Sequence, residues 1–410
     1  MSGSVETSVP FKTEPVRLLL YIIVLFSFFR FLHDLVKLLI ESPFIDFAHY
    51  YTYAMILAEG HSPLDADAAK QVDARLGIHS AGVSAMYSPW FYFVMGVLTR
   101  LPFRQAAAVW VFVNQVCLWS ALLLCLRRFN TAQPAGIAVA LFVLLNFQPL
   151  LEDLALGQSN VVLLFFMTLA WWGLRTDTTW VSAGAVVAAL CIKMQYGLLL
   201  PFLWLMGFRQ VFWKAVVLAG VWLGMGIMLL GSSLHIDWLR SLGTVPDFYN
   251  SWTRNLSVRA TLFRLFGEHV TSERVLVEII SLVASATIVV FTLRVIRWPT
   301  PPSPAAIDWA WGLGLCVMLL LSPLTEEHHL VVLLLPLTLL VLDRTDPPMR
   351  PRDVAILVAS ILLLGSRYSF EQFPAFHQGI LSLLMTGKVL GVFGLAWVLI
   401  SRLRVERARP

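Results

Sequence analysis

The sequence predicts an all-α polytopic membrane protein, and two observations support that prediction. Of its 410 residues, 58% are hydrophobic and 13% are charged, and the mean hydropathy is +0.75, whereas about 25% of the residues of a soluble domain are charged. Apolar runs also recur from Leu18 to the end of the chain, with no long polar block between them. We therefore expect one membrane domain over residues 1–410 and no separate soluble domain.

The first apolar run, Leu18 to Phe29, follows basic residues and could suggest a secretory signal. No small-residue cleavage site follows it, so we expect a retained first helix over about residues 16–40. Charged side chains recur on this helix at helical spacing. One explanation is a salt-bridged stripe whose side chains face the bundle or extend to the membrane interface. The other is a role near a phosphate. These side chains are Arg30, His33, Asp34 and Lys37.

Several later apolar runs contain only about 11 to 15 residues, fewer than the roughly 20 that cross a bilayer. We expect short, partly re-entrant helices that line a polar space. Basic clusters between the runs, placed in the cytoplasm by the positive-inside rule, give about twelve crossings with both termini cytoplasmic. Residues 87–126 contain Arg100 and Arg104 between two runs, so the sequence leaves the topology of this stretch open.

This topology places two large loops outside the cytoplasm, at 41–86 and 232–272, and a basic cytoplasmic tail at 401–410. In the first loop, residues 47–60 and 65–76 are predicted to be short amphipathic helices that lie at the membrane surface. They are too polar to span the bilayer, and Gly and Pro interrupt them. We expect the protein to be located in the plasma membrane, which it crosses several times.

The four cysteines stand singly inside apolar runs, which predicts buried packing residues and neither a disulfide nor a metal site. They are Cys117, Cys125, Cys191 and Cys316. The net charge of +5 comes from short basic clusters between the spans, so no nucleic-acid partner is needed to explain it.

Polar clusters collect on the predicted outer side, and several have an ordinary structural explanation. Gln158 and Asn160 either cap the next helix or bind a ligand. Lys193 could snorkel to the interface, and Asn255 begins a glycosylation sequon that could be plain loop. The clusters are Asp46 with His49 and Tyr50; Tyr87; Gln158 with Asn160; Lys193; Arg254 with Asn255; and Glu326 and Glu327 with His328 and His329.

Two of these clusters are harder to explain structurally. Asp46 follows the first apolar run where a helix should enter the headgroup layer. Glu327, His328 and His329 are polar groups at membrane depth, which cost about 2.5 kcal/mol or more each unless they are paired or hydrated. Adjacent histidines face different sides of a helix, so they do not make a metal-binding pair of the i, i+4 kind.

The order of these motifs resembles glycosyltransferase family 87, which includes the mycobacterial phosphatidylinositol-mannoside mannosyltransferase. The resemblance runs from about Arg17 to Leu342, with two departures: no doubled proline at Tyr87-Ser-Pro89, and no proline after Lys193-Met-Gln195. The motifs are Asp46-Phe-x-x-Tyr50-Tyr51, Tyr87-x-Pro89, Gly157-Gln-x-Asn160, Ala183-Gly184 followed by Lys193, Asn255-x-Ser257, and Ser322-Pro323 with His328-His329-Leu.

The resemblance implies the GT-C membrane fold and transfer of a sugar, mannose above all, from a polyprenyl-phosphate donor. The acceptor would be a hydroxyl of a glycolipid or glycan on the extracytoplasmic side, and the anomeric centre would be inverted. Asp46 matches the catalytic aspartate of the family and would act as general base. Neither a metal nor another cofactor is expected, because a lipid phosphate is already a good leaving group.

The departing phosphate needs positive charge and hydrogen-bond donors. We expect these from Lys193 and Arg254, with His328 and His329 as further donors. The remaining candidates for binding the donor phosphate or sugar are Glu327, Tyr50, His49, Gln158, Asn160, Tyr87 and Asn255.

Two other classes of protein fit the hydropathy. A multipass transporter or flippase for lipid-linked sugars is one, although no internal repeat with paired broken helices is visible and the polar groups crowd one side. A non-catalytic scaffold would leave Asp46 and the His328-His329 pair unexplained. The sequence does not specify the acceptor, the sugar or the oligomeric state.

Overall fold

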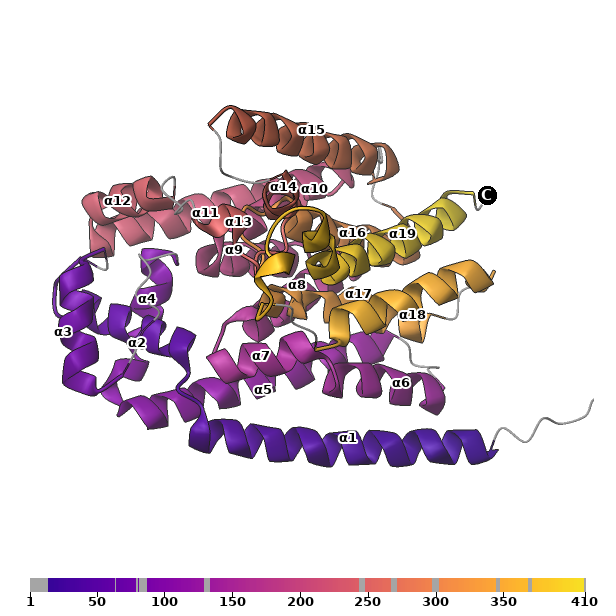
Figure 1. Cartoon of the computed structure of the whole chain (residues 1–410), viewed down its shortest axis with the longest axis horizontal. Coiled ribbons are helices and arrows are strands. Elements are labelled where there is room, and N and C mark those ends of the chain that lie inside the picture. Colours follow the sequence, from indigo (N-terminus) through magenta and orange to yellow (C-terminus); the bar gives the residue numbers. More distant parts are fainter. Residues whose placement is uncertain are drawn as a thin grey trace, which may run out of the picture.

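The computed structural model describes residues 14–62, 64–78, 80, 87–128, 133–242, 248–266, 271–296, 302–343, 347–367 and 371–408. Every regular element in these ranges is a helix, and they contain no strand (Figure 1). The predicted all-α architecture is therefore confirmed. Parts of the predicted loops 41–86 and 232–272, and the last two residues of the tail, lie outside the described ranges.

The helices follow one another as a series of long and short segments. In the first half these are α1 (Glu14–Glu41), α2 (Ile45–Ala58), α3 (Ala66–Leu76), α4 (Pro89–Met95), η1 (Leu98–Arg100), α5 (Phe103–Arg128), α6 (Pro134–Leu145), α7 (Gln148–Leu156), α8 (Asn160–Arg175), α9 (Thr179–Ile192), η2 (Met194–Leu198) and α10 (Leu199–Leu205).

The second half begins with long α11 and ends with long α19. Its helices are α11 (Arg209–Leu230), α12 (Ser232–Leu242), α13 (Phe248–Ser251), α14 (Val258–Phe266), α15 (Thr271–Ile296), α16 (Pro304–Leu321), η3 (Glu327–Leu333), α17 (Leu334–Leu342), α18 (Pro351–Gly365), η4 (Pro374–Phe376), η5 (Ile380–Thr386) and α19 (Gly387–Arg407). Figure 1 shows α1 along one edge and α15 along the opposite edge, with α2, α3 and α4 gathered at one end.

Six helical segments of the described chain are long and apolar enough to cross a membrane, or seven if the bent pair α6 and α7 counts as one span. The chain is thus a multipass membrane protein, but the twelve predicted crossings are not confirmed. Several predicted spans are shorter helices: α9, for example, has 14 residues and is about 21 Å long at 1.5 Å per residue, against about 30 Å of hydrocarbon.

Residues 87–126, whose topology the sequence left open, contain one helix of span length. The first run forms only the seven-residue α4 and the short η1, and the second forms the 26-residue α5. Leu101 and Pro102 separate η1 from α5. The two basic residues therefore flank a break before α5 and do not divide two spans.

Helix α2 corrects one expectation for the first loop. It was predicted to be an amphipathic surface helix, but nine of its 14 residues are buried, because aromatic side chains of α2, α4 and α5 pack around it. Helix α3 is polar, as expected: Asp65 caps its N-terminus through the backbone N–H groups of Asp67 and Ala68. Gly77, with φ +63°, ends it.

The core of the bundle is built around α16, in which every residue from Ala306 to Leu320 is buried. A helix that is apolar on all sides belongs in an interior. Its one carboxylate, Asp308, pairs with Arg175 and accepts a hydrogen bond of 2.8 Å from Trp171 Nε1. A buried charge is tolerable only when it is paired in this way.

The cysteines are all free: Cys125 and Cys316 are buried, and Cys117 and Cys191 are half-buried. The charged stripe of α1 contacts the bundle at Arg30. Arg30 faces the bundle, since its guanidinium donates to Leu145 O and Asn146 Oδ1, both at 3.1 Å.

Candidate functional site

The backbone around Asp46 is fixed by contacts between the α1–α2 connection and α7. Ser42 Oγ donates to Ala155 O at 2.5 Å, and the backbone N–H of Phe44 donates to Ser42 Oγ at 3.1 Å. Phe44 has the left-handed conformation, with φ 48°, which turns the chain sharply before α2. Asp46 then lies in the first turn of α2, where the helix dipole favours a carboxylate.

A glycine allows α2 to approach the start of α8. Gly157 ends α7 with φ +70°, and a Cβ placed on it would lie 2.6 Å from Phe47 Cβ. Only glycine fits both the backbone conformation and this close approach. The next residue, Gln158, is thereby brought against Asp46, 112 positions earlier in the chain.

Gln158 links Asp46 to two tyrosines. Its Nε2 donates to Asp46 Oδ2 at 3.0 Å. Its Oε1 accepts hydrogen bonds from Tyr50 OH at 2.7 Å and Tyr87 OH at 2.9 Å, and the two tyrosine hydroxyls are 2.7 Å apart. Because Oε1 accepts from both tyrosines, the amide nitrogen is the atom that faces the carboxylate.

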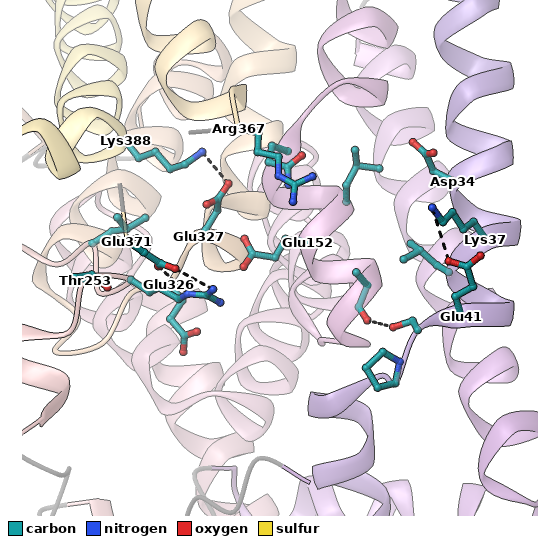
Figure 2. Close-up of a pocket in the computed structure, with 18 of the residues that line it drawn as sticks. Asp34, Lys37, Glu41, Glu152, Thr253, Glu326, Glu327, Arg367, Glu371 and Lys388 are labelled. Atoms are coloured by element: carbon teal, nitrogen blue, oxygen red, sulfur yellow. Dashed lines mark hydrogen bonds and ion pairs between the residues drawn. The ribbon is translucent and has the colours of Figure 1, made fainter. Parts of the chain in front are cut away.

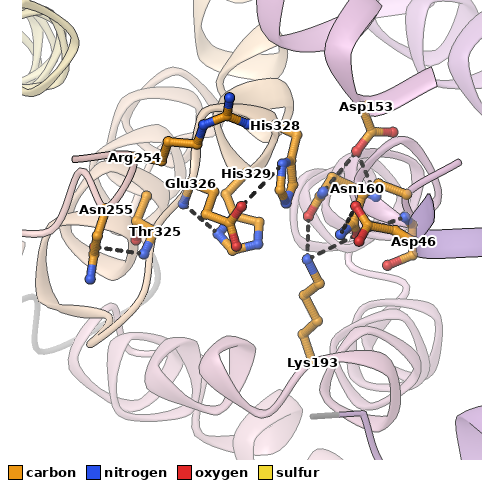
Figure 3. Close-up of polar contacts among 12 residues, drawn as sticks. Asp46, Asp153, Asn160, Lys193, Arg254, Asn255, Thr325, Glu326, His328 and His329 are labelled. Carbon is orange, nitrogen blue, oxygen red and sulfur yellow. Dashed lines mark hydrogen bonds and ion pairs between the residues drawn. The ribbon is translucent and has the colours of Figure 1, made fainter. Parts of the chain in front are cut away.

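Lys193 supplies the positive charge of this network. It caps the C-terminus of α9, and its Nζ donates to Asn160 Oδ1 at 3.0 Å and lies 3.5 Å from Gln158 Oε1 (Figure 3). Asn160 Nδ2 in turn donates to Asp153 Oδ1 at 2.7 Å. Asp153 is fully buried, and it is a member of the network that the sequence analysis missed.

Burial governs the titration of the charged groups. It raises the pKa of Asp46, while the Gln158 hydrogen bond and the charge of Lys193 act in the opposite direction. It lowers the pKa of Lys193, opposed by the charges of Asp153, Glu326 and Asp46. A carboxylate and an ammonium thus share one partly buried space.

Across this space lie Glu326 and the two histidines, which come from the turn into η3 (Figure 3). The backbone N–H of Glu326 donates to His329 Nδ1 at 3.0 Å, and Glu326 Oε2 is 3.9 Å from His328 Nδ1. His328 is 2% exposed, yet neither of its ring nitrogens hydrogen-bonds to a described residue. Buried polar atoms normally have partners, so this ring is available to a ligand.

The structure distinguishes Glu326 from Glu327, which the sequence analysis had favoured. Glu327 pairs with Lys388 at 2.8 Å. Burial raises the pKa of Glu326 to about 7, with Asp46 and Glu152 raising it further, while Lys193 and Arg254 lower it. Adjacent residues face different sides of a short helix, and the sequence alone could not tell which of the two faces the site.

Three other predicted residues have supporting positions. His49 Nε2 lies 3.0 Å from Tyr92 OH, and its ring packs 4.2 Å from that of Tyr53, so it stabilises the aromatic cluster. Arg254 forms a two-pronged ion pair with Glu371 at 2.8 and 3.1 Å.

Asn255 is fully buried, and among the described residues its side-chain amide makes four hydrogen bonds, all to backbone groups. Its Nδ2 donates to the carbonyls of Tyr249 and Pro323, both at 2.9 Å. Its Oδ1 accepts from the N–H groups of Ser257 at 3.0 Å and Thr325 at 3.2 Å. Asn255 therefore fastens two loops together, and this burial also leaves no exposed amide for a glycan.

A cavity of about 660 Å³ adjoins the network (Figure 2). Ser42 and Pro43, just before Asp46, form part of its wall, and Glu326 belongs to both the cavity and the network. Figure 2 shows Asp34, Lys37 and Glu41 of α1 on one side and Glu327 and Lys388 on the other. The other charged lining residues are Glu152, Arg254, Arg367 and Glu371.

The arrangement suits chemistry on a hydroxyl group next to a departing anion. Asp46 can accept a proton, and the Lys193 ammonium with its amide neighbours can stabilise developing negative charge. Within the described ranges, no group of three or more His, Cys, Asp or Glu side chains is placed to hold a metal ion.

Comparison with known proteins gives one family match. The model of glycosyltransferase family 87 matches residues 85–323, a range that includes Gln158, Asn160 and Lys193 but neither Asp46 nor the His328-His329 pair. No curated protein matches the chain, so the predicted likeness to the mycobacterial mannosyltransferase is unconfirmed. Among solved structures, ArnT from Cupriavidus metallidurans bound to undecaprenyl phosphate is similar with a TM-score of 0.37 and 14% identity, over 92% of this chain and 77% of that one.

Proposed function

The chain belongs to glycosyltransferase family 87, whose model matches more than half of it, and on that premise we propose a donor, an acceptor class and a mechanism for this multipass membrane glycosyltransferase. The donor is a polyprenyl-phosphate sugar, and the sugar is mannose. The acceptor is a hydroxyl of a glycolipid or glycan. The reaction takes place on the extracytoplasmic side of the plasma membrane, with both termini in the cytoplasm and the GT-C architecture that the family implies.

In the proposed reaction Asp46 acts as general base. The acceptor oxygen bonds to the anomeric carbon from the face opposite the phosphate, and Asp46 takes the hydroxyl proton. The bond between the anomeric carbon and the phosphate oxygen breaks, and its electron pair leaves with the polyprenyl phosphate. The configuration at the anomeric carbon is inverted by this single displacement.

Lys193 stabilises the departing phosphate in this mechanism, with His328 as a hydrogen-bond donor. The observation that supports the assignment most directly is the network in which Gln158 touches both Asp46, at 3.0 Å, and Lys193, at 3.5 Å. A base and a cation separated by one side chain fit a reaction in which the anomeric carbon lies between the acceptor hydroxyl and the departing phosphate. The base would face the hydroxyl and the cation would face the phosphate. The reaction needs no metal ion in this proposal, because Lys193 supplies the positive charge.

Transfer of labelled mannose from synthetic polyprenyl-phosphate-mannose into lipid and polymer fractions tests this function. Asp46→Asn keeps the shape and removes the base, so the rate should fall by about 10²- to 10⁴-fold while donor binding stays unchanged. Asp237→Asn, at a half-exposed carboxylate of α12, is the matched control. Activity of the wild type should survive a chelator, and loss of activity with recovery on adding Mg²⁺ or Mn²⁺ would contradict metal independence.

The alternative, a flippase for lipid-linked sugars, predicts a different outcome. The wild type and the Asp46→Asn variant would both bind the donor lipid, and neither would transfer sugar to any fraction. Asp46→Asn would move the lipid across a vesicle membrane as fast as the wild type. That combination would overturn the transferase mechanism.

A further inference from the structure

The cavity next to Asp46 has its own charge pattern, which bears on what it binds. It has six carboxylate-bearing residues in its wall and four cationic ones. Three of the four cations are already held by carboxylates of the same wall. The pairs are Lys37 with Glu41 at 3.7 Å, Arg254 with Glu371 at 2.8 and 3.1 Å, and Lys388 with Glu327 at 2.8 Å.

Lys388 shows that this pairing is built into the fold. Its side chain is 4% exposed, and its Nζ also donates to the carbonyls of Leu364 at 3.0 Å and Ser366 at 2.8 Å. An ammonium with three protein acceptors has no proton left for a ligand. Lys388 therefore offers little to an incoming anion.

Three carboxylates of the wall lie outside these pairs: Asp34, which is 3.4 Å from His33 Nδ1, Glu152 and Glu326. The side chain of Glu152, in α7, makes no hydrogen bond or ion pair with another residue in the described part of the chain. Among the described residues, Glu326 has no cationic partner: its side chain accepts from the backbone N–H of His329 in a capping box and lies 3.9 Å from His328 Nδ1, which leaves it further acceptor capacity. Both line the cavity, and carboxylate oxygens accept strong hydrogen bonds from hydroxyl groups.

The wall does not suit a prenyl chain. Charged residues form the majority of it, and an apolar chain in contact with them would strip water from charges without replacing the hydrogen bonds. The apolar lining residues are few: Leu38, Pro43, Leu151, Ala155, Leu256 and Met385.

We propose that this cavity binds the uncharged polyhydroxyl part of the sugar acceptor, with Glu152 and Glu326 accepting hydrogen bonds from its hydroxyl groups. The acceptor class is thus a neutral glycan headgroup, and the carboxylates outside the ion pairs disfavour a headgroup that presents phosphate here. This inference rests on the proposed function, and it adds the chemistry of the acceptor to it.

Direct binding to the purified full-length protein tests the proposal without relying on turnover. The probes are a panel of neutral short-chain alkyl mannosides and dimannosides, and the same glycosides carrying one phosphate on the sugar. Calorimetric titration in detergent micelles gives a Kd for each. The wild type should bind the best neutral probe at least about tenfold more tightly than its phosphorylated counterpart.

Two variants of one residue sharpen the test. Glu152→Gln should weaken binding of the neutral probe by about tenfold, because an amide oxygen is a weaker hydrogen-bond acceptor than a carboxylate oxygen. Glu152→Lys should improve binding of the phosphorylated probe relative to the neutral one. Glu14→Gln is the matched control, since that carboxylate is 88% exposed at the start of α1, and it should leave every Kd unchanged.

Three results would overturn the inference: tighter binding of phosphorylated than of neutral probes, no binding of either set, or weaker binding of the donor lipid to Glu152→Gln with neutral-probe binding intact. The last would assign the cavity to the donor. Sugar transfer is measured separately. If neutral probes bind as expected but no polyprenyl-phosphate sugar is ever transferred, the proposed function fails and the chemistry of the cavity stands.

Discussion

Replacing Gln158 by Leu should move the acid limb of the pH–rate profile to higher pH. Burial raises the pKa of Asp46, and the hydrogen bond from Gln158 is the first of the effects that oppose this rise. A donor to a carboxylate stabilises the charged form. Its removal therefore raises the pKa further, so that Asp46 is protonated, and inactive as a base, over a wider range of acid pH.

The size of the shift follows from the one contact that is lost. A hydrogen bond to a charged group contributes about 1.5–3 kcal/mol, and one pKa unit corresponds to about 1.36 kcal/mol. The acid limb should therefore move up by about one to two pH units. On that limb the variant should be about 10- to 100-fold slower than the wild type, and the gap should narrow as the pH rises above both pKa values.

The assay is kcat/KM for sugar transfer from the donor lipid, measured from about pH 4.5 to pH 9 at fixed acceptor concentration. Gln71→Leu, at an exposed position of α3, controls for the loss of an amide. Because Gln158 also binds Tyr50 and Tyr87, the plateau could fall without any change at Asp46. A lower plateau with an unmoved acid limb would refute the argument, because it would show that Gln158 does not set the pKa of the base.

Lys193→Met should weaken binding of labelled polyprenyl phosphate by about 10- to 100-fold, because a charge-assisted contact of about 1.5–3 kcal/mol is lost; Lys193→Arg should recover part of it. Equal binding by wild type and Lys193→Met would contradict the assignment of this cation to the phosphate. Gly157→Ala should lower the thermal unfolding temperature and the transfer rate together, because a Cβ there meets Phe47 Cβ at 2.6 Å and a left-handed residue costs about 1–2 kcal/mol. Gly184→Ala in α9, where a Cβ meets nothing within 4 Å, should instead stabilise the protein by about 0.5–1 kcal/mol, and equal effects of the two changes would contradict this account.

The sequence by itself determined the class of protein and the position of its principal carboxylate. Composition and recurrent apolar runs predicted an all-helical membrane protein. They could do so because the hydropathy of a segment depends only on its own residues and not on tertiary contacts. The place of Asp46 just after the first long helix also follows from local sequence, and α1 ends at Glu41 as that pattern requires. The motif order predicted the family to which the chain belongs.

The number of spans depended on more than local hydropathy. Short apolar helices such as α9 have the composition of spans but not the length. Helix α2 is buried although its sequence contains polar residues, because the aromatic side chains around it come from α4 and α5. Whether α2 is buried depends on residues that are distant in sequence, and the hydrophobic periodicity of α2 itself contains no information about them.

Only the tertiary structure decided which polar residues meet. Gln158 reaches Asp46 across 112 positions, and Arg254 meets Glu371 across 117. The same long-range packing selected Glu326 over its neighbour for the site and placed Asp153 in the network. These pairings depend on how α2, α7 and η3 approach one another, which is set by close contacts such as that at Gly157. A linear pattern contains the residue types, but the distances between them arise only when the helices pack.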